Sequence, residues 1–566
     1  MLHRRTALAL LLAATAIVPS PTIGAQSPGA SDIRQDDLKR WLTYIASDEL
    51  QGRAVFSTGI GLAAGYLAGE LRAAGLAPGG DNGSFLQTVT VNGVRATSRS
   101  RVTVTVGGET RTFTDGGGVT FPRNAGGPQT IAIDHVEFAG YGLDIPSAGV
   151  TSYAGRDVAG ATVVWLGPSG PIGVDQRLQR LLNGRARAAL ERGARASIGQ
   201  AAPPAGRGTP AAAAAQAPPA GRGGIPPADF TTSQRLDRPV APAITAGDEF
   251  FEFLFRAAPV PYADLKRLVA SREPLPSFRL DGVTIRFDVD TSYEVVRTQL
   301  AQNVVAVIEG GDARLKDRYV AFGAHYDHVG YAEGEVTGTD GTARRTGAPG
   351  TVTRGAEQDR VWNGADDDGS GTVTLLALAR AFARGPRPRR SLVFVWHTGE
   401  ERGLLGSRYF VDHPAVPLDR IEAQLNIDMV GRNRGDRPSE ANTVYPVGSD
   451  RISSELDAVL RAANEALPRP LTLDYTLNDP ADPEQIYYRS DHYSYAARGV
   501  PIVFFTTNLH PDYHANTDEV SKIEFEKLWR IAGLVYETGF RLANRDAPLV
   551  RDNRGPRATG PAPARR

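Results

Sequence analysis

The sequence predicts an α/β protein with a mixed, mostly parallel β-sheet flanked by helices and with a β-rich insertion. From Asn303 onward, short apolar runs alternate with stretches long enough to form helices. Because these runs are apolar throughout, they are typical of strands that helices cover on both faces. Between about residues 101 and 289, by contrast, short strand-like segments follow one another, which indicates a unit built mainly from strands.

The N-terminal region predicts two helices, because apolar residues recur at helical spacing over residues 31–46 and 60–74. A polar loop at residues 48–53 separates them. In the β-rich region, strands are expected at residues 101–106, 131–138, 161–166 and 283–289. Two segments rich in proline, residues 201–229 and 546–566, cannot bury enough apolar surface to fold and are predicted to be disordered.

The remaining elements alternate along the chain. Predicted strands cover residues 304–308, 319–324, 392–396, 423–427 and 502–505. Predicted helices cover residues 371–384, 452–466 and 523–544. Helices that alternate with apolar strands place the helices on both faces of one largely parallel sheet.

Residues 1–25 have the pattern of a secretory signal peptide. Arg4 and Arg5 precede an apolar run from Ala7 to Val18, and residues 23–25 supply the small side chains that a signal peptidase needs. The run is shorter than the roughly 20 residues of a spanning helix. A periplasmic or secreted protein with no membrane anchor is therefore expected.

Composition excludes several classes of function. The 566-residue chain has a formal net charge of +0, which gives no reason to expect nucleic acid or an anionic membrane surface as a partner. It contains no cysteine, so disulfides, thiolate metal ligands and a cysteine nucleophile are all excluded. Any transition metal must be held by histidine, aspartate and glutamate. Composition leaves the oligomeric state open.

Five polar motifs carry the candidate chemistry, and four of them follow predicted strands while the fifth precedes a helix. Their central residues are His325, Asp367, Glu400 with Glu401, Asp428 and His514. Ligands of open α/β sheets gather outside the carboxyl ends of the strands, so these side chains are expected at one edge of one sheet. Imidazole nitrogens and carboxylate oxygens without thiolates are the donor set of a hydrolytic pair of zinc ions.

These motifs resemble the metal-site motifs of the M28 family of zinc peptidases. The matching segments are His325-Tyr-Asp327, Asp366-Asp367-Asp368-Gly-Ser-Gly371, Glu400-Glu401-Arg-Gly-Leu-Leu-Gly-Ser407, Asp428-Met and Tyr513-His514. Residues 50–53 and 490–493 are also similar to secreted bacterial members. The resemblance implies the zinc exopeptidase fold, with a protease-associated-like β-rich domain inserted into the peptidase domain.

The resemblance also implies a division of the chain. The expected parts of the chain are a signal peptide at 1–25, an N-terminal part of the peptidase domain at 26–130, the inserted domain at 131–292, the catalytic domain at 293–545 and a tail at 546–566.

The resemblance assigns roles to the site residues. Two Zn²⁺ ions per chain are implied, one held by His325 and Asp428, the other by Glu401 and His514, with Asp367 bridging both. Asp327 orients His325, Glu400 acts as general base, and Tyr513 hydrogen-bonds the developing oxyanion. Family members often have a cis peptide bond after the bridging aspartate. His328 is expected to be structural, and His492 is expected to support the site without binding metal.

The implied function is an aminopeptidase that acts on peptides or small proteins. A glutamate-preferring carboxypeptidase is the first alternative and would need a basic pocket, for which Arg489 and Arg432 are candidates. A single-zinc glutaminyl-cyclase-like enzyme and a non-catalytic receptor-like protein are further alternatives, against which the complete ligand set and the Glu400–Glu401 pair count. The polar segment 331–362 is longer than the family commonly has, and it is expected to form a loop near the cleft.

Overall fold

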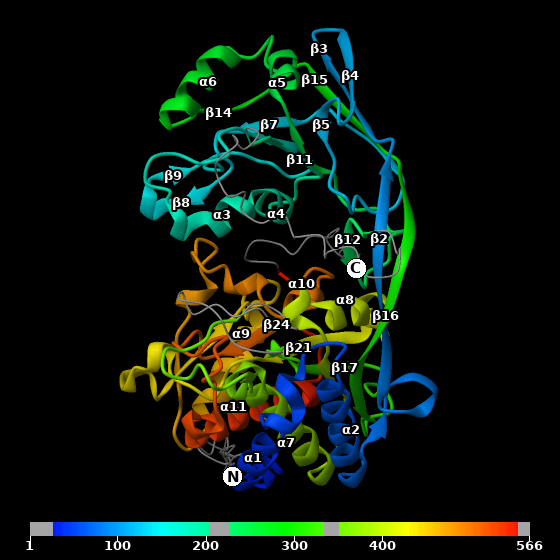
Figure 1. Ribbon diagram of the computed structural model, residues 1–566, viewed down its shortest axis with the longest axis vertical. Coiled ribbons are helices and arrows are strands. Elements are labelled where there is room, and N and C mark those ends of the chain that lie inside the picture. Colours follow the sequence, from blue (N-terminus) through cyan, green and yellow to red (C-terminus); the bar gives the residue numbers. More distant parts are fainter. Residues whose placement is uncertain (1–26, 203–226, 333–349, 553–566) are drawn as a thin grey trace, which may run out of the picture.

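The computed structural model describes residues 27–202, 227–332 and 350–552. The predicted signal peptide lies outside the described residues, as do most of the predicted disordered tract and tail and the middle of segment 331–362. Figure 1 shows two sheet-containing parts stacked along the long axis of the molecule, and the N-terminal helices share the lower part with the C-terminal half of the chain. No helix among the described residues combines the length and the apolar character needed to cross a membrane.

The lower part is built on a mixed sheet whose centre is parallel. Its central strands are β20 (Ser391–His397), β17 (Tyr319–His325), β21 (Ile421–Ile427) and β24 (Ile502–Thr506), paired in that order. Antiparallel neighbours flank this centre, β16 (Thr291–Ile308) beside β20 and β22 (Thr443–Val447) beside β24. The predicted mixed α/β sheet is confirmed, and all four central strands lie where the sequence predicts them.

Helices cover both faces of this sheet. One face carries α1 (Gln35–Ile45), α2 (Thr58–Ala73), α7 (Gly371–Arg384), α9 (Ser454–Glu465) and α11 (Phe525–Asn544). The other face carries α8 (Leu405–Asp412) and α10 (His492–Ala496). Alternate residues of one strand enter opposite cores: Val320 and Phe322 pack on the first face, and Ala321 on the second. This alternation explains why the central strands read as uninterrupted apolar runs.

A long antiparallel ribbon was not predicted. β2 (Leu86–Ser98) pairs with β16 from Leu86 opposite Val304 to Ser98 opposite Thr291. In Figure 1 these two strands run up one side of the molecule and join its lower and upper parts. Only residues 304–308 of β16 were predicted, because residues 292–300 are mostly exposed and mix polar with apolar side chains, which hides the signal of a buried strand.

The upper part is a second ten-stranded sheet with its own apolar core. In spatial order its strands are β14 (Ser277–Arg279), β7 (Val136–Ala139), β10 (Thr162–Trp165), β11 (Ala196–Gln200), β13 (Ala243–Ala246), β5 (Gly118–Thr120), β4 (Glu109–Asp115), β3 (Arg101–Val106), β15 (Val283–Val289) and β6 (Gln129–Ile133). Its helices are α3 (Gln179–Asn183), α4 (Arg185–Glu191), α5 (Asp248–Leu254) and α6 (Tyr262–Ser271).

The second sheet includes strands that precede the residues predicted for the inserted domain. The sheet begins at Arg101, earlier than residue 131, and the strand predicted at 131–138 is two strands separated at residues 134–135. In addition, β12 (Phe230–Thr232) pairs with β2 in the first sheet. The division into domains stays a prediction. Short strands complete the fold: β1 (Ala77–Pro78), β8 (Asp144–Ile145), β9 (Val150–Thr151), β18 (Gly330–Tyr331), β19 (Val361–Trp362) and β23 (Thr472–Leu473).

Candidate metal centre

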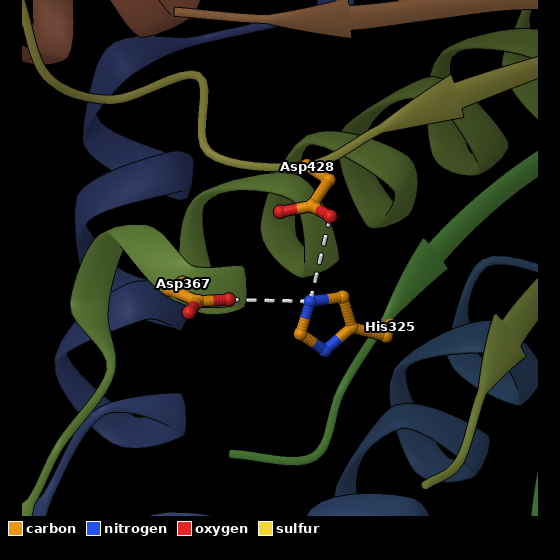
Figure 2. A group of neighbouring side chains, drawn as sticks. All are labelled: His325, Asp367 and Asp428. Carbon is orange, nitrogen blue, oxygen red and sulfur yellow. Dashed lines mark ion pairs between the residues drawn. The ribbon is translucent and has the colours of Figure 1, made fainter. Parts of the chain in front are cut away.

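The ends of the central strands bring the predicted site residues together. His325 is the last residue of β17, Asp428 directly follows β21, and Asp367 lies in the turn that leads into α7. Figure 2 shows their side chains facing one another from these separate elements. The parallel strands end at the same sheet edge, so residues more than 100 positions apart in the sequence become neighbours.

The first cluster centres on the imidazole of His325. Its Nε2 atom lies 3.2 Å from Asp367 Oδ1 and 3.7 Å from Asp428 Oδ2. All three residues are buried, and one ligand atom from each lies within 4.8 Å of the others. The other ring nitrogen, Nδ1, is 3.1 Å from the backbone oxygen of Asp327 and 3.7 Å from its carboxylate. Asp327 therefore fixes the Nδ1 side of the ring, and Nε2 faces the carboxylates of Asp367 and Asp428.

The second cluster contains the other oxygen of Asp367. His514 Nε2 lies 3.0 Å from Asp367 Oδ2 and 3.0 Å from Glu401 Oε2. His328 also reaches this cluster, with Nδ1 at 3.1 Å from Glu401 Oε1 and 3.8 Å from Asp367 Oδ2. The two imidazoles differ in access: the His514 side chain is 22% exposed and lines the site cavity, whereas that of His328 is fully buried. His514 is thus the better ligand candidate, whereas the buried imidazole of His328 contacts Glu401 without reaching the cavity.

The carboxylate of Asp327 joins two of the motifs. Its oxygens accept hydrogen bonds from the backbone N–H groups of Glu400 and Glu401, at 3.1 and 3.3 Å. A buried carboxylate that accepts two backbone donors fixes the chain that supplies them. Asp327 therefore places the Glu400–Glu401 turn relative to His325, a contact that the sequence alone did not indicate.

The outer two of the three consecutive aspartates also hold backbone. Asp368 accepts from the N–H groups of His325 at 3.2 Å and Met429 at 3.2 Å, which ties two ligand-bearing strand ends together. Asp366 Oδ1 accepts from the N–H of Gly431 at 2.6 Å. Only the middle residue, Asp367, faces the site cavity. The peptide bond between Asp367 and Asp368 is cis, as the family resemblance implied.

Arg53 is a residue that sequence reasoning left without a role. Its side chain is fully buried, and it donates only to backbone oxygens: those of Tyr326 at 3.0 Å, Ile45 at 2.5 Å, Asn363 at 2.6 Å and Gly364 at 2.9 Å. Burial lowers its pKa to about 10. Tyr326 follows a ligand residue and Gly364 precedes another, so Arg53 binds both ligand-bearing loops to the N-terminal segment. Residues 50–53 resemble secreted bacterial family members, but that resemblance gave no indication of this contact.

The two adjacent glutamates have opposite electrostatic environments. Burial raises the pKa of Glu400 well above its usual value, and the neighbouring carboxylate of Glu401 adds to this effect. Burial also acts on Glu401, but His514 and His328 lie against its oxygens and lower its pKa to about 2. Neighbouring groups whose pKa values are pushed apart are suited to different tasks, one as a proton carrier and the other as a permanent anion.

Tyr513 completes the wall of the site. Its ring stacks on that of His514 with 4.0 Å between centroids, and its hydroxyl accepts a hydrogen bond from Arg489 Nη2 at 3.3 Å. Burial raises its pKa well above the usual value, so the hydroxyl keeps its proton and remains a donor. The cavity, about 60 Å³ in volume, is lined by His325, Asp367, Glu400, Asp428, Tyr513 and His514 together with apolar and polar neighbours.

The remaining candidates lie apart from the ligand clusters. His492 Nε2 is 2.7 Å from the backbone oxygen of Tyr487, and its ring stacks on Phe504. Burial lowers its pKa to about 3, so it stays neutral. Asp491 lies 3.4 Å from Nδ1 of His397 and does not line the cavity. Of the described part of segment 331–362, Thr351 pairs with the site loop, its backbone N–H donating to the oxygen of His514 at 2.8 Å.

The donor set of both clusters fits zinc. It consists of imidazole nitrogens and carboxylate oxygens that are already close together and largely buried, with no thiolate in the chain. Several buried carboxylates this close to one another require compensating positive charge, which a divalent cation supplies. Asp367 contributes a different oxygen to each cluster, which is the arrangement needed for a ligand shared by two cations.

Known proteins resemble this region in sequence. Residues 303–539 match the sequence model of Peptidase family M28. Leucine aminopeptidase 1 of Arthroderma otae is 25% identical over 243 residues, which are 41% of this chain and 56% of the relative. Leucine aminopeptidase 1 of Ajellomyces capsulatus is 31% identical over 221 residues, covering 34% of this chain and 53% of the relative. The chain thus spans about half the length of the curated relatives it matches.

Among solved structures, the aminopeptidase from Aneurinibacillus sp. strain AM-1 is 18% identical with a TM-score of 0.43, and the match covers 92% of this chain and 97% of that one. The family match spans all five ligand candidates and both glutamates. Residues 303–539 of this chain are thus similar to peptidase family M28, and these residues contain the whole candidate site.

Proposed function

We propose that this protein is a secreted two-zinc aminopeptidase that releases N-terminal residues from peptides. The observation that carries the proposal is the contrast between Glu400 and Glu401 beside two ligand clusters that share Asp367. One glutamate is suited to carry a proton and the other to hold a cation, and both lie at one small cavity or its edge. Secretion rests on the signal-peptide pattern of residues 1–25.

The proposed ligands divide between two cations. His325 and Asp428 belong to one, Glu401 and His514 to the other, and Asp367 to both. Zinc held there would lower the pKa of a water molecule from 15.7 towards roughly 7 and polarise the carbonyl of the scissile bond. Glu400 accepts the proton of the attacking water and passes it to the leaving amine. The hydroxyl of Tyr513 donates to the carbonyl oxygen as negative charge develops on it.

The charges around the cavity favour a substrate with a free amino group. The carboxylates of Asp367, Glu400 and Asp428 line the cavity. Among the described residues that line it, the one arginine is Arg489, which is paired with Glu484 at 2.8 Å. Arg432, the other basic candidate for a carboxypeptidase, pairs with Asp436 and Asp512 and does not line the cavity. The described residues of the cavity therefore offer no unpaired basic side chain to a free carboxylate, which favours an aminopeptidase over a carboxypeptidase.

The cavity also supports an apolar residue at the cleaved position. Met429, Ile486, Phe504 and Leu509 contribute to its wall. The names of the relatives, which are leucine aminopeptidases, support the same preference. The second sheet is proposed to be a protease-associated-like unit inserted into the peptidase chain.

The test is a comparison of two substrate classes with the purified protein. Leucyl 4-nitroanilide should be hydrolysed, whereas an N-acetylated peptide with a free C-terminus should not. A chelator should abolish hydrolysis and zinc should restore it, with two zinc ions per chain by elemental analysis. Hydrolysis of the N-acetylated peptide from its C-terminus without activity on the anilide would establish the carboxypeptidase alternative. A chain that binds no zinc would end the proposal.

A further inference from the structure

The segment from Glu484 to Arg489 lies between the candidate site and the second sheet's helices. Ile486 and Arg489 line the site cavity. Tyr488, between them in sequence, lines a separate cavity of about 210 Å³ that also contacts Glu191 at the end of α4. Residues 484–489 therefore contribute side chains to the site cavity and also contact helix α4 of the second sheet's unit.

Helix α4 holds this segment through two contacts on Tyr488. The Tyr488 hydroxyl donates to Glu191 Oε2 at 2.5 Å, and the guanidinium carbon of Arg187 lies 3.5 Å from the centre of the tyrosine ring. Glu191 is only 1% exposed, so its hydrogen bond is shielded from water. A third contact joins α3 to the segment, with Arg180 Nε at 3.5 Å from Glu484 Oε2. That pair is largely exposed and contributes less.

The segment passes these restraints to the site through Arg489. Arg489 Nη1 donates to Glu484 Oε2 at 2.8 Å, and its Nη2 donates to the hydroxyl of Tyr513 at 3.3 Å. Tyr513 in turn stacks on His514. Because Arg489 directly follows Tyr488, a shift of the tyrosine moves the guanidinium that orients the Tyr513 hydroxyl.

We infer that α4 of the second sheet's unit positions the substrate-binding wall of the site, with Glu191 and Arg187 acting through Tyr488 on Ile486 and Arg489. Glu191 is a positioning residue, because it contacts the wall and not the reacting atoms. This gives the β-rich unit a task in catalysis: it supports one side of the cavity from outside the peptidase sheet. The expected change in KM rests on the proposed peptidase function, whereas the contacts between α4 and residues 484–489 do not.

The test compares three variants with the wild-type protein. Glu191→Ala removes the acceptor and Tyr488→Phe removes the donor, so each should raise KM for leucyl 4-nitroanilide roughly three- to tenfold, the scale of one lost hydrogen bond. Turnover should fall as well, because Arg489 orients the Tyr513 hydroxyl, whereas zinc content should stay within about twofold. Glu191→Gln keeps an oxygen that accepts from Tyr488 and should restore the wild-type KM. Hydrogen–deuterium exchange of a peptide covering residues 479–489 should accelerate in the first two variants only.

Arg192→Ala is the matched control. Arg192 follows Glu191, but its guanidinium pairs with Asp144 at 3.1 Å and lies over the ring of Tyr153, both within the second unit. It should leave both KM and exchange unchanged. Unchanged KM in Glu191→Ala and Tyr488→Phe would overturn the inference, whether or not exchange accelerates. A wild-type protein without peptidase activity would instead refute the proposed function, and the exchange comparison would still decide whether α4 holds the segment.

Discussion

The guanidinium of Arg53 donates to the backbone oxygen of Asn363, with 2.6 Å between Nη1 and the oxygen. The same side chain donates to the oxygen of Tyr326 at 3.0 Å. Asn363 lies four positions before Asp367, and Tyr326 directly follows His325. Arg53 therefore binds together the two chain segments that supply ligands to the first cluster, although it comes from the N-terminal segment.

Replacement of Arg53 by methionine should weaken metal binding before it abolishes folding. The buried backbone oxygens would lose their donors at a cost of about 1–3 kcal/mol each in free energy of unfolding, partly relieved by water. Loss of an outer contact of this kind typically lowers metal affinity by about 10–100-fold. Competition with a chromophoric zinc chelator measures the affinity. Arg40→Ala, at an exposed pair with Asp37, is the control and should change neither quantity measurably. Unaltered zinc affinity in the Arg53 variant would show that the two ligand-bearing loops keep their positions without Arg53.

The adjacent glutamates should respond differently to the same substitution. Glu400→Gln removes the proton carrier and should lower kcat by about 10²–10⁴-fold while zinc content stays at the wild-type level. Glu401→Gln removes a metal ligand and should lower zinc content at equal free zinc. Elemental analysis beside steady-state kinetics separates the two effects. Full turnover in Glu400→Gln, or full zinc content in Glu401→Gln, would contradict the assigned roles.

The two imidazoles beside Glu401 give a further contrast. His514→Ala should cost one zinc ion per chain, because His514 reaches the cavity and lies 3.0 Å from both Asp367 and Glu401. His328→Ala should retain both ions with reduced affinity, because His328 contacts Glu401 from the buried side. Zinc content after dialysis at several fixed free-zinc concentrations tests this order. Loss of an ion in the His328 variant alone would make His328 the ligand.

Sequence patterns predicted the sheet centre and the ligand candidates because both depend on local regularities. Apolar runs mark buried strands, and the polar residues that end them fall at one sheet edge by topology alone. His325 and Asp428 are 103 positions apart, yet parallel pairing of β17 with β21 makes them neighbours. His328 was predicted to be structural, although its spacing from His325 says nothing about which imidazole faces the cavity.

Contacts between distant segments were beyond the reach of these patterns. Arg53 acts through bonds to backbone oxygens, which leave no trace in the identity of the residues that supply them. The β2–β16 ribbon was missed for a different reason. Its exposed residues, such as Val295 and Leu300, do not alternate cleanly with buried ones, so the pairing depends on the partner strand and not on a hydrophobic pattern.

The buried carboxyl group of Glu191 should make stability depend on pH. Burial raises its pKa from an ordinary 4.5 to about 7, although Tyr488 and the cations of Arg451, Arg187 and Arg192 oppose this shift. The folded state therefore binds the proton more tightly than the unfolded state.

The stabilisation from this proton is complete below about pH 4.5 and is lost as pH rises through about 7. Relative to Glu191→Gln, which cannot ionise, the wild-type free energy of unfolding should fall by at most about 3 kcal/mol between pH 5 and pH 8. Urea unfolding of both proteins at several pH values measures this difference. Parallel pH profiles for the two proteins would show that Glu191 ionises in the folded protein as it does in the unfolded chain. Such a result would mean that the surrounding arginines offset its burial completely.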